Sequence, residues 1–74
     1  MPLRPLPYRD VKRKLEAAGF TERSHRGGSH VKFARITPTE TRTAIVPRHR
    51  EVAIGTLRSI LRQAGLSEEE FDKL

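Results

Sequence analysis

The sequence predicts a small α+β domain in the order α-β-β-β-α, with a three-stranded antiparallel sheet covered on one face by two helices. Three observations predict this fold. Apolar residues recur at helical spacing near both ends of the chain, and the middle is rich in β-branched residues that alternate with polar ones. The turns between the expected strands are also too short for the crossovers that parallel strands need.

The first helix is expected over residues 8–18, followed by a glycine stop. Its apolar face is formed by Tyr8, Val11, Leu15 and Ala18. Gly19 supplies the left-handed residue that ends a helix, and Phe20 can fold back on the last turn. Basic residues between the apolar ones give the helix a strongly basic outer face.

Three strands are expected between the helices. Residues 20–25 form a short, mixed strand, and residues 41–46 form a β-branched one that Pro47 ends. The second strand, residues 30–36, alternates: Val31 and Phe33 share one face, and the other carries His30, Lys32 and Ala34. If Val31 and Phe33 face the helices, His30 and Lys32 must face outward.

The second helix begins near Ile54, and its apolar stripe is formed by Ile54, Leu57, Ile60, Leu61 and Ala64. Gly65 ends it, and Ser67 with Glu70 is the signature of a capping box for one last helical turn. The expected core consists of Val11, Leu15, Val31, Phe33, Leu57, Ile60 and Leu61. We treat residues 1–74 as a single domain, in which residues 1–7 form a Pro-rich arm without an assigned role.

Charge indicates a polyanionic partner. The chain has 15 Lys and Arg against 9 Asp and Glu, a net charge of +6. Residues 1–67 carry 14 of the bases and 5 of the acids, a net +9. Nucleic acid is the leading candidate partner, and the predominance of Arg over Lys suits phosphate contact. The alternative is that a basic surface only keeps a small protein in solution.

Several function classes are excluded. There is no Cys, no apolar run long enough to span a membrane and no signal-peptide core, so we expect a cytoplasmic protein without membrane contact. Motifs for nucleotide triphosphates, metalloprotease helices and nucleophile elbows are missing. The three histidines, His25, His30 and His49, have no acid or Cys spaced among them as metal sites require, so we expect no metal and no cofactor.

Histidine, Arg and hydroxyl groups remain as catalytic material, and RNA hydrolysis needs no more than these. An imidazole can accept or donate a proton near neutral pH, and cations can stabilise the charged phosphorane. An isolated surface histidine such as His30 is more often ordinary polar surface, so the residues alone leave its role open. The segment Gly27-Gly28-Ser29 can approach a phosphate closely or simply form a turn. His49 lies in a basic loop, where a phosphate or structural contact is expected.

An ordered set of short motifs resembles the HicA family of mRNA interferase toxins. The set is Gly19-Phe20, Gly28-Ser29-His30, Val46-Pro47 with His49, Gly55-Thr56-Leu57-Arg58, Ile60-Leu61, Ala64-Gly65-Leu66 and Glu69-Glu70-Phe71. The resemblance covers residues 8–72. It implies a fold like that of double-stranded-RNA-binding domains, cleavage of mRNA and an antitoxin of the HicB family. It also implies that His30 is catalytic, because the family's histidine belongs to the Gly-Ser-His segment.

Three hypotheses follow from the sequence. The first is a metal-independent endoribonuclease toxin with His30 as its catalyst. Its expected RNA contacts are Arg26, Gly28, Ser29, Lys32, Arg48 and His49. The second is an RNA-binding module that uses the same basic face without cutting. The third is an interaction domain whose basic surface serves an acidic protein partner.

Overall fold

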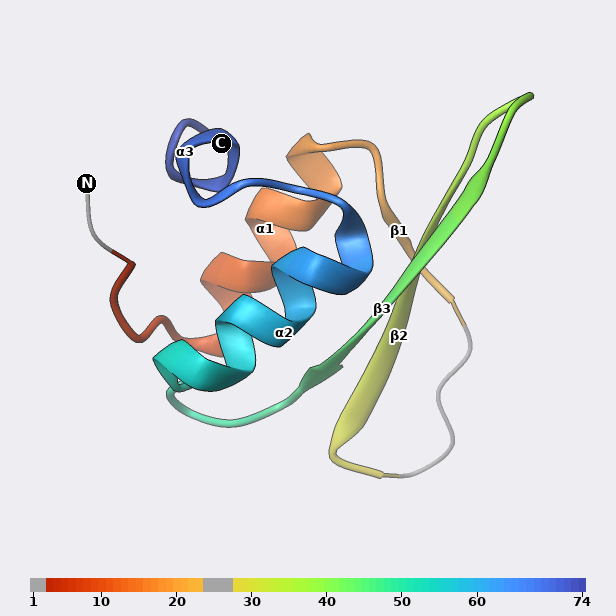
Figure 1. Ribbon diagram of the computed structural model, residues 1–74. Coiled ribbons are helices and arrows are strands. Elements are labelled where there is room, and N and C mark those ends of the chain that lie inside the picture. The colour runs from red at the N-terminus through yellow and green to blue at the C-terminus, as the bar shows by residue number, and fades with distance from the viewer. Residues whose placement is uncertain (1–2, 24–27) are drawn as a thin grey trace.

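The computed structural model describes residues 3–23 and 28–74 and has the expected α+β architecture. The elements are α1 (Tyr8–Ala17), β1 (Thr21–Glu22), β2 (His30–Ile36), β3 (Thr41–Pro47), α2 (Ile54–Ala64) and α3 (Glu68–Asp72). The strands form one antiparallel sheet in the order β1-β2-β3. Helices α1 and α2 lie on the same face of the sheet, and none of the described helices covers the other face (Figure 1). The prediction of an α-β-β-β-α order is confirmed.

The core lies between the sheet and the helices. All seven residues expected there are buried. The remaining members of the core cluster are Phe20, Ala44, Val46, Val52, Ala64 and Phe71. None of the buried residues that the structure describes is polar or charged. The fold therefore depends on a single thin apolar layer.

Helices α1 and α2 end in the same way. Gly19 follows α1 with a φ of 95°, and the N–H of Phe20 donates to the Leu15 carbonyl at 2.9 Å. Gly65, with a φ of 73°, and Leu66 repeat this arrangement at the end of α2. The left-handed glycine lets the chain turn back, and the apolar residue after it packs on the core. The expectation for Gly19 and Phe20 is confirmed.

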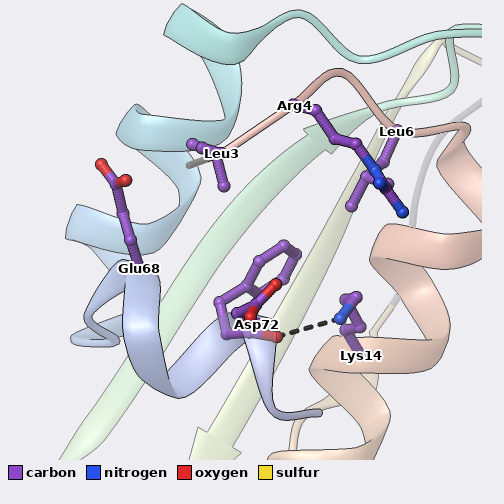
Figure 2. A pocket seen from close by; sticks show the side chains of 7 residues that line it. Leu3, Arg4, Leu6, Lys14, Glu68 and Asp72 are labelled. Carbon is purple, nitrogen blue, oxygen red and sulfur yellow. Dashed lines mark hydrogen bonds between the residues drawn. The ribbon is translucent and has the colours of Figure 1, made fainter. Parts of the chain in front are cut away.

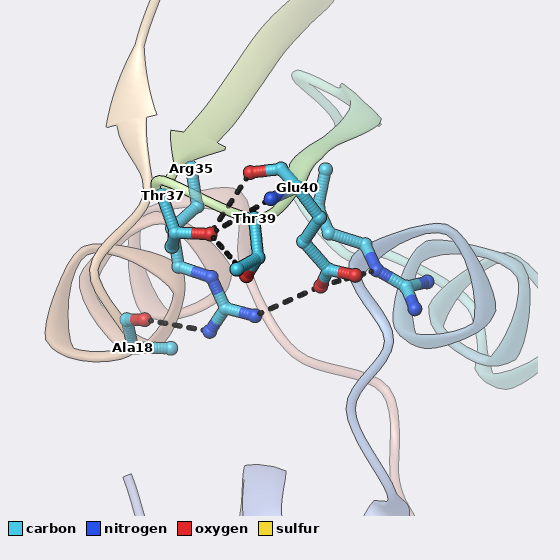
Figure 3. Close-up of polar contacts among 6 residues, drawn as sticks. Ala18, Arg35, Thr37, Thr39 and Glu40 are labelled. Atoms are coloured by element: carbon cyan, nitrogen blue, oxygen red, sulfur yellow. Dashed lines mark hydrogen bonds and ion pairs between the residues drawn. The ribbon is translucent and has the colours of Figure 1, made fainter.

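Arg35, on the helix-facing side of β2, closes the end of α1. Its Nη1 atom donates to the carbonyl oxygen of Ala18 at 3.3 Å (Figure 3). Its guanidinium lies 5.1 Å from the centre of the Phe20 ring. The last carbonyls of a helix carry partial negative charge, so a cation there is favourable.

Arg42, the cross-strand partner of Arg35, lies against the end of α2. Its guanidinium covers Gly65 so closely that a Cβ there would lie 2.8 Å from Cζ. Glu40 accepts a hydrogen bond from Arg42 Nε at 3.1 Å, and its carboxylate lies 4.0 Å from Arg35 (Figure 3). The β2–β3 hairpin thus connects both helix ends through one acidic residue.

The hairpin turn is closed by a threonine side chain. Thr37 Oγ1 accepts a hydrogen bond from the N–H of Glu40 at 3.1 Å, and the N–H of Thr37 donates to the Glu40 carbonyl at 2.8 Å. A side-chain oxygen that bonds the backbone nearby can stabilise a turn without glycine. This explains why the Thr-rich connection forms a tight hairpin.

Pro47 is the last residue of β3, whereas the sequence predicted that the strand would end before it. The N–H of Ile45 points away from β2, because it donates to Gln63 Oε1 at 3.0 Å. By alternation, the nitrogen of Pro47 also points away from β2. A proline on an edge strand costs no ladder hydrogen bond when its nitrogen faces outward, so β3 can include it.

The N-terminal arm packs against the domain. Leu6 forms an isolated antiparallel bridge with Val52, and the side chains of Leu3 and Leu6 pack against the core. A small pocket lies where the arm meets α1 and α3 (Figure 2); its lining is Leu3, Arg4, Leu6, Lys14, Glu68, Phe71 and Asp72. The sequence assigned the arm no role, because its packing depends on Val52, which is more than forty positions from Leu6 in the chain.

Each end of α3 is closed by hydrogen bonds. Ser67 and Glu70 form the expected capping box, and the hydrogen bond from the Ser67 backbone lowers the pKa of Glu70. Lys14 of α1 donates from Nζ to the carbonyl oxygen of Phe71 at 3.0 Å (Figure 2) and to that of Leu74 at 3.1 Å. The ring of Phe71 is buried beneath this contact.

Truncating Leu57 to Ala should strongly destabilise the protein. Leu57 is fully buried, so the change removes apolar contacts and leaves a cavity, at a cost of about 2–5 kcal/mol in the free energy of unfolding. Urea denaturation followed by circular dichroism measures this cost. Arg58→Ala is the matched control on the same helix, since this exposed side chain has only a surface ion pair with Glu68 at 3.2 Å. Equal effects of the two changes would contradict the core described here.

Candidate functional site

The open face of the sheet carries the residues that alternate with the core. They are Thr21 of β1, His30, Lys32, Ala34 and Ile36 of β2, and Thr41, Thr43, Ile45 and Pro47 of β3. His30 and Lys32 are exposed there, whereas Val31 and Phe33 are fully buried beneath the helices. The expectation that the pleat turns His30 and Lys32 outward is confirmed.

His30 is the first residue of β2 and lies opposite Pro47 on β3. Its Nδ1 atom is 3.3 Å from Ser29 Oγ, at the long end of the hydrogen-bond range. Among the described residues, Nε2 has no hydrogen-bond partner. The imidazole is therefore held on one side by Ser29 and presents its other nitrogen to solvent, at the end of a strand that the core fixes in place.

Two cations lie beside this histidine along the sheet. Lys32 is two residues further on the same face of β2, about 6–7 Å along the strand. The N–H of Arg23 donates to the Lys32 carbonyl at 2.8 Å, which places Arg23 next to Lys32 at the end of β1. Arg23 was not among the site residues predicted from the sequence. Arg23 is two residues after the exposed Thr21, so strand alternation could have predicted that it faces the same side. A strand of only two residues is too short to establish that alternation from the sequence.

Arg48 lies beside the histidine segment, but its side chain turns toward the helices. Its N–H donates to the Ser29 carbonyl, which extends the β2–β3 ladder past His30. The guanidinium is 5.9 Å from the centre of the Tyr8 ring at the start of α1. The structure thus brings Arg48 to the same end of the sheet as His30, on the side that carries the helices.

The other expected contact residues differ in position. His49 is exposed, and its carbonyl oxygen accepts the N–H of Tyr8 at 3.3 Å, so its backbone ties the loop to α1. Gly28 is exposed in a bend directly before β2. Arg26 lies outside the described residues, as does His25, and the structure gives no geometry for either.

The described residues offer no group of metal ligands and no membrane-spanning helix. Over residues 3–23 and 28–74, no group of three His, Asp or Glu side chains is arranged to hold a metal ion. In the same part of the chain, no helix has the length and apolar character to cross a membrane.

The fold and the site define a small basic α+β domain with a histidine on the open face of a one-sided sheet. Comparison with protein families identifies it further: the HicA toxins of bacterial toxin–antitoxin systems match residues 8–66, so the chain belongs to this family. It is the toxin of a toxin–antitoxin pair, and the family implies an antitoxin partner. Toxins of this family are generally known to cleave mRNA. No individual curated protein matched the chain.

Replacing Ser29 by Ala should change the tautomer ratio of neutral His30. The contact between Ser29 Oγ and Nδ1 favours one tautomer, and Ala removes that preference without touching the core. The ratio can be measured from the ¹⁵N chemical shifts of the imidazole. Ser29→Thr, which keeps the hydroxyl, is the control and should stay close to the original protein. Identical ratios in all three proteins would show that Ser29 does not orient the ring.

Proposed function

We propose that this protein is a metal-independent endoribonuclease that cleaves mRNA, with His30 as its single catalytic residue. The observation that carries the proposal is the position of His30: exposed on the open sheet face, in contact with Ser29 through Nδ1, and followed on that face by Lys32. Family membership supports the same conclusion, because HicA toxins are generally mRNA-cleaving.

The reaction requires two proton transfers and stabilisation of charge. The 2′-hydroxyl of one nucleotide attacks the adjacent phosphorus, which gives a 2′,3′-cyclic phosphate and releases the 5′-oxygen of the next nucleotide. The 2′-hydroxyl loses its proton, and the leaving oxygen gains one. Neutral imidazole can perform the first transfer and imidazolium the second. His30 performs one of them through Nε2, and Lys32 offsets the extra negative charge of the phosphorane.

RNA binding in this proposal is spread over the end of the sheet around His30. Lys32 supplies charge on the open face, and Arg48 supplies it at the same end of the sheet from the helix side. Ser29 and the backbone at Gly28 supply hydrogen-bond donors close to the histidine. His49 and Arg26 are the remaining proposed contacts. Because many phosphate contacts share the affinity, the loss of any one of them should weaken binding only in part.

The proposed partner is an antitoxin of the HicB type that covers the face around His30. A compact basic body attracts an acidic protein over long range, and a protein seated over His30 excludes RNA by its bulk and by its charge. We place this activity in the cytoplasm, where the mRNA substrate is found.

Replacing His30 by Ala should abolish cleavage and preserve both folding and RNA binding. The loss of one proton-transfer group typically costs about 10²–10⁴ in rate, whereas His30 contributes nothing to the core. Cleavage of a labelled RNA, binding of the same RNA and circular dichroism measure the three properties. Arg58→Ala is the matched control, since it removes an exposed side chain of α2 outside the proposed site and should leave the rate close to that of the original protein.

Three outcomes would contradict the mechanism. A folded His30→Ala protein that cuts at the original rate would exclude His30 as the catalyst. Loss of cleavage by the original protein in EDTA would exclude a metal-independent reaction. If the original protein binds RNA and never cuts it, the protein is the RNA-binding module of the second hypothesis.

Association with the antitoxin should slow as salt increases. Electrostatic attraction accelerates the encounter of oppositely charged proteins, and added salt screens it beyond about 8–10 Å. Stopped-flow measurements at several salt concentrations give the association rate constant, and Lys32→Gln should lower it at low salt. An inhibited complex in which His30 is still open to RNA, as seen by hydrogen exchange or by structure, would contradict direct occlusion.

A further inference from the structure

A shallow hollow lies on the open face of the sheet next to the His30 site. It is lined by Glu22, Arg23, Lys32, Ala34, Ile36, Thr41 and Thr43. Ala34 forms its floor: this residue is on the open face, yet it is only 6% exposed. It lies on the central strand between Thr21 and Thr43, and these neighbours cover its small side chain. The hollow thus continues the catalytic face along β2 toward Ile36.

The charge of the hollow suits an anion. Arg23 and Lys32 lie on its rim, and neither forms an ion pair among the described residues. Glu22 is the one acid in the lining, and its carboxylate receives a hydrogen bond from Lys12 of α1 at 2.7 Å. That hydrogen bond raises the pKa of Lys12, as a closely paired ammonium requires. The Glu22 carboxylate is thus paired with Lys12 on the helix side, and Arg23 and Lys32 lie on the rim of the hollow on the open face.

The hollow also offers apolar contact. Ile36 is 65% exposed and Ile45 is 42% exposed, and they are the two exposed large apolar side chains in the described part of the chain. Ile36 lines the far end of the hollow, and Ile45 is the cross-strand neighbour of Lys32. Single-stranded nucleic acid binds surfaces that combine cations for its phosphates with platforms, usually aromatic, for its unstacked bases. Here the cations are present, and isoleucine offers the apolar contact for a base.

We propose that this hollow binds the nucleotides adjacent to the scissile phosphate, with single-stranded RNA running along β2 from His30 toward Ile36. The inference rests on the proposed function and adds the substrate class and the binding track. From His30 to Ile36 the strand advances about 20 Å, which leaves room beyond the nucleotide that is cut. Phosphates would contact Lys32 and Arg23, and a base would lie over Ala34 against Ile36.

The threonines give this track a basis for sequence preference. Thr41 and Thr43 lie on the wall of the hollow, and each hydroxyl can both donate and accept a hydrogen bond. Contacts to phosphate position a nucleic acid, whereas contacts to base edges discriminate between sequences. A duplex could not lay the flat face of a base over Ala34 in this way, since its bases are stacked and paired.

The experiment measures RNA binding to the hollow without cleavage. The probe is single-stranded 2′-O-methyl RNA, which cannot be cut because its attacking hydroxyls are blocked. Thr43→Glu places a negative charge in the hollow, and it should weaken binding about tenfold. Ala17→Glu is the matched control: it adds the same charge at an exposed position of α1, on the other side of the sheet. It should change affinity by less than about twofold, and circular dichroism verifies that both variants fold.

Amide signals in NMR spectra provide the second measurement. Addition of the probe should shift the signals of Ala34 and Thr43 in the original protein. Unmoved signals, or equal affinities for Thr43→Glu and Ala17→Glu, would overturn the inference. Signals that move only with an acidic antitoxin would also overturn it, because they would assign the hollow to the protein partner. A failure of the His30 mechanism gives a different result. In that case His30→Ala would still cut RNA, and the binding of the probe to the hollow would be unchanged.

Discussion

The alternation of buried and exposed side chains along β2 is the constraint on which the rest of the structure depends. Val31 and Phe33 are fully buried, so their strand can lie on the helices in one register only. That register turns His30 and Lys32 to the open face and pairs Arg35 with Arg42 on the helix side. A shift by one residue would bury an imidazole and an ammonium and expose two large apolar side chains. The core therefore fixes the orientation of the site without contributing a side chain to it.

The structure also divides the basic residues by task. Arg35 and Arg42 close the ends of the two long helices, and Lys14 holds the carbonyl oxygens of the last one. Arg23 and Lys32 have no acidic partner among the described residues and lie on the open face. Net charge alone therefore overstates the charge available to RNA, because part of it stabilises the fold.

A thin core and an exposed site suit each other in a domain of this size. No residue of the buried layer is polar or charged among the described residues, and the polar atoms that are buried without a hydrogen bond, Tyr8 Oη and Arg35 Nε, belong to residues at its margin. The functional groups lie on the central strand, where His30 is paired with β3 and Lys32 lies between β3 and Arg23, and this holds them more firmly than a loop would. The N-terminal arm adds to this layer through Leu6 and its bridge to Val52.

The sequence by itself determined the element order, the helix ends and the outward direction of His30 and Lys32, because helical and strand periodicities are local and differ clearly. It indicated the core through the same periodicities, but it missed Val52, which follows no helical or strand pattern of its own. Only the tertiary structure decided that Arg23 lies beside Lys32, that Arg48 stacks on Tyr8 and that the arm packs on the core. These contacts join residues far apart in the chain, and no local pattern can specify which distant surface a short strand or an arm will meet.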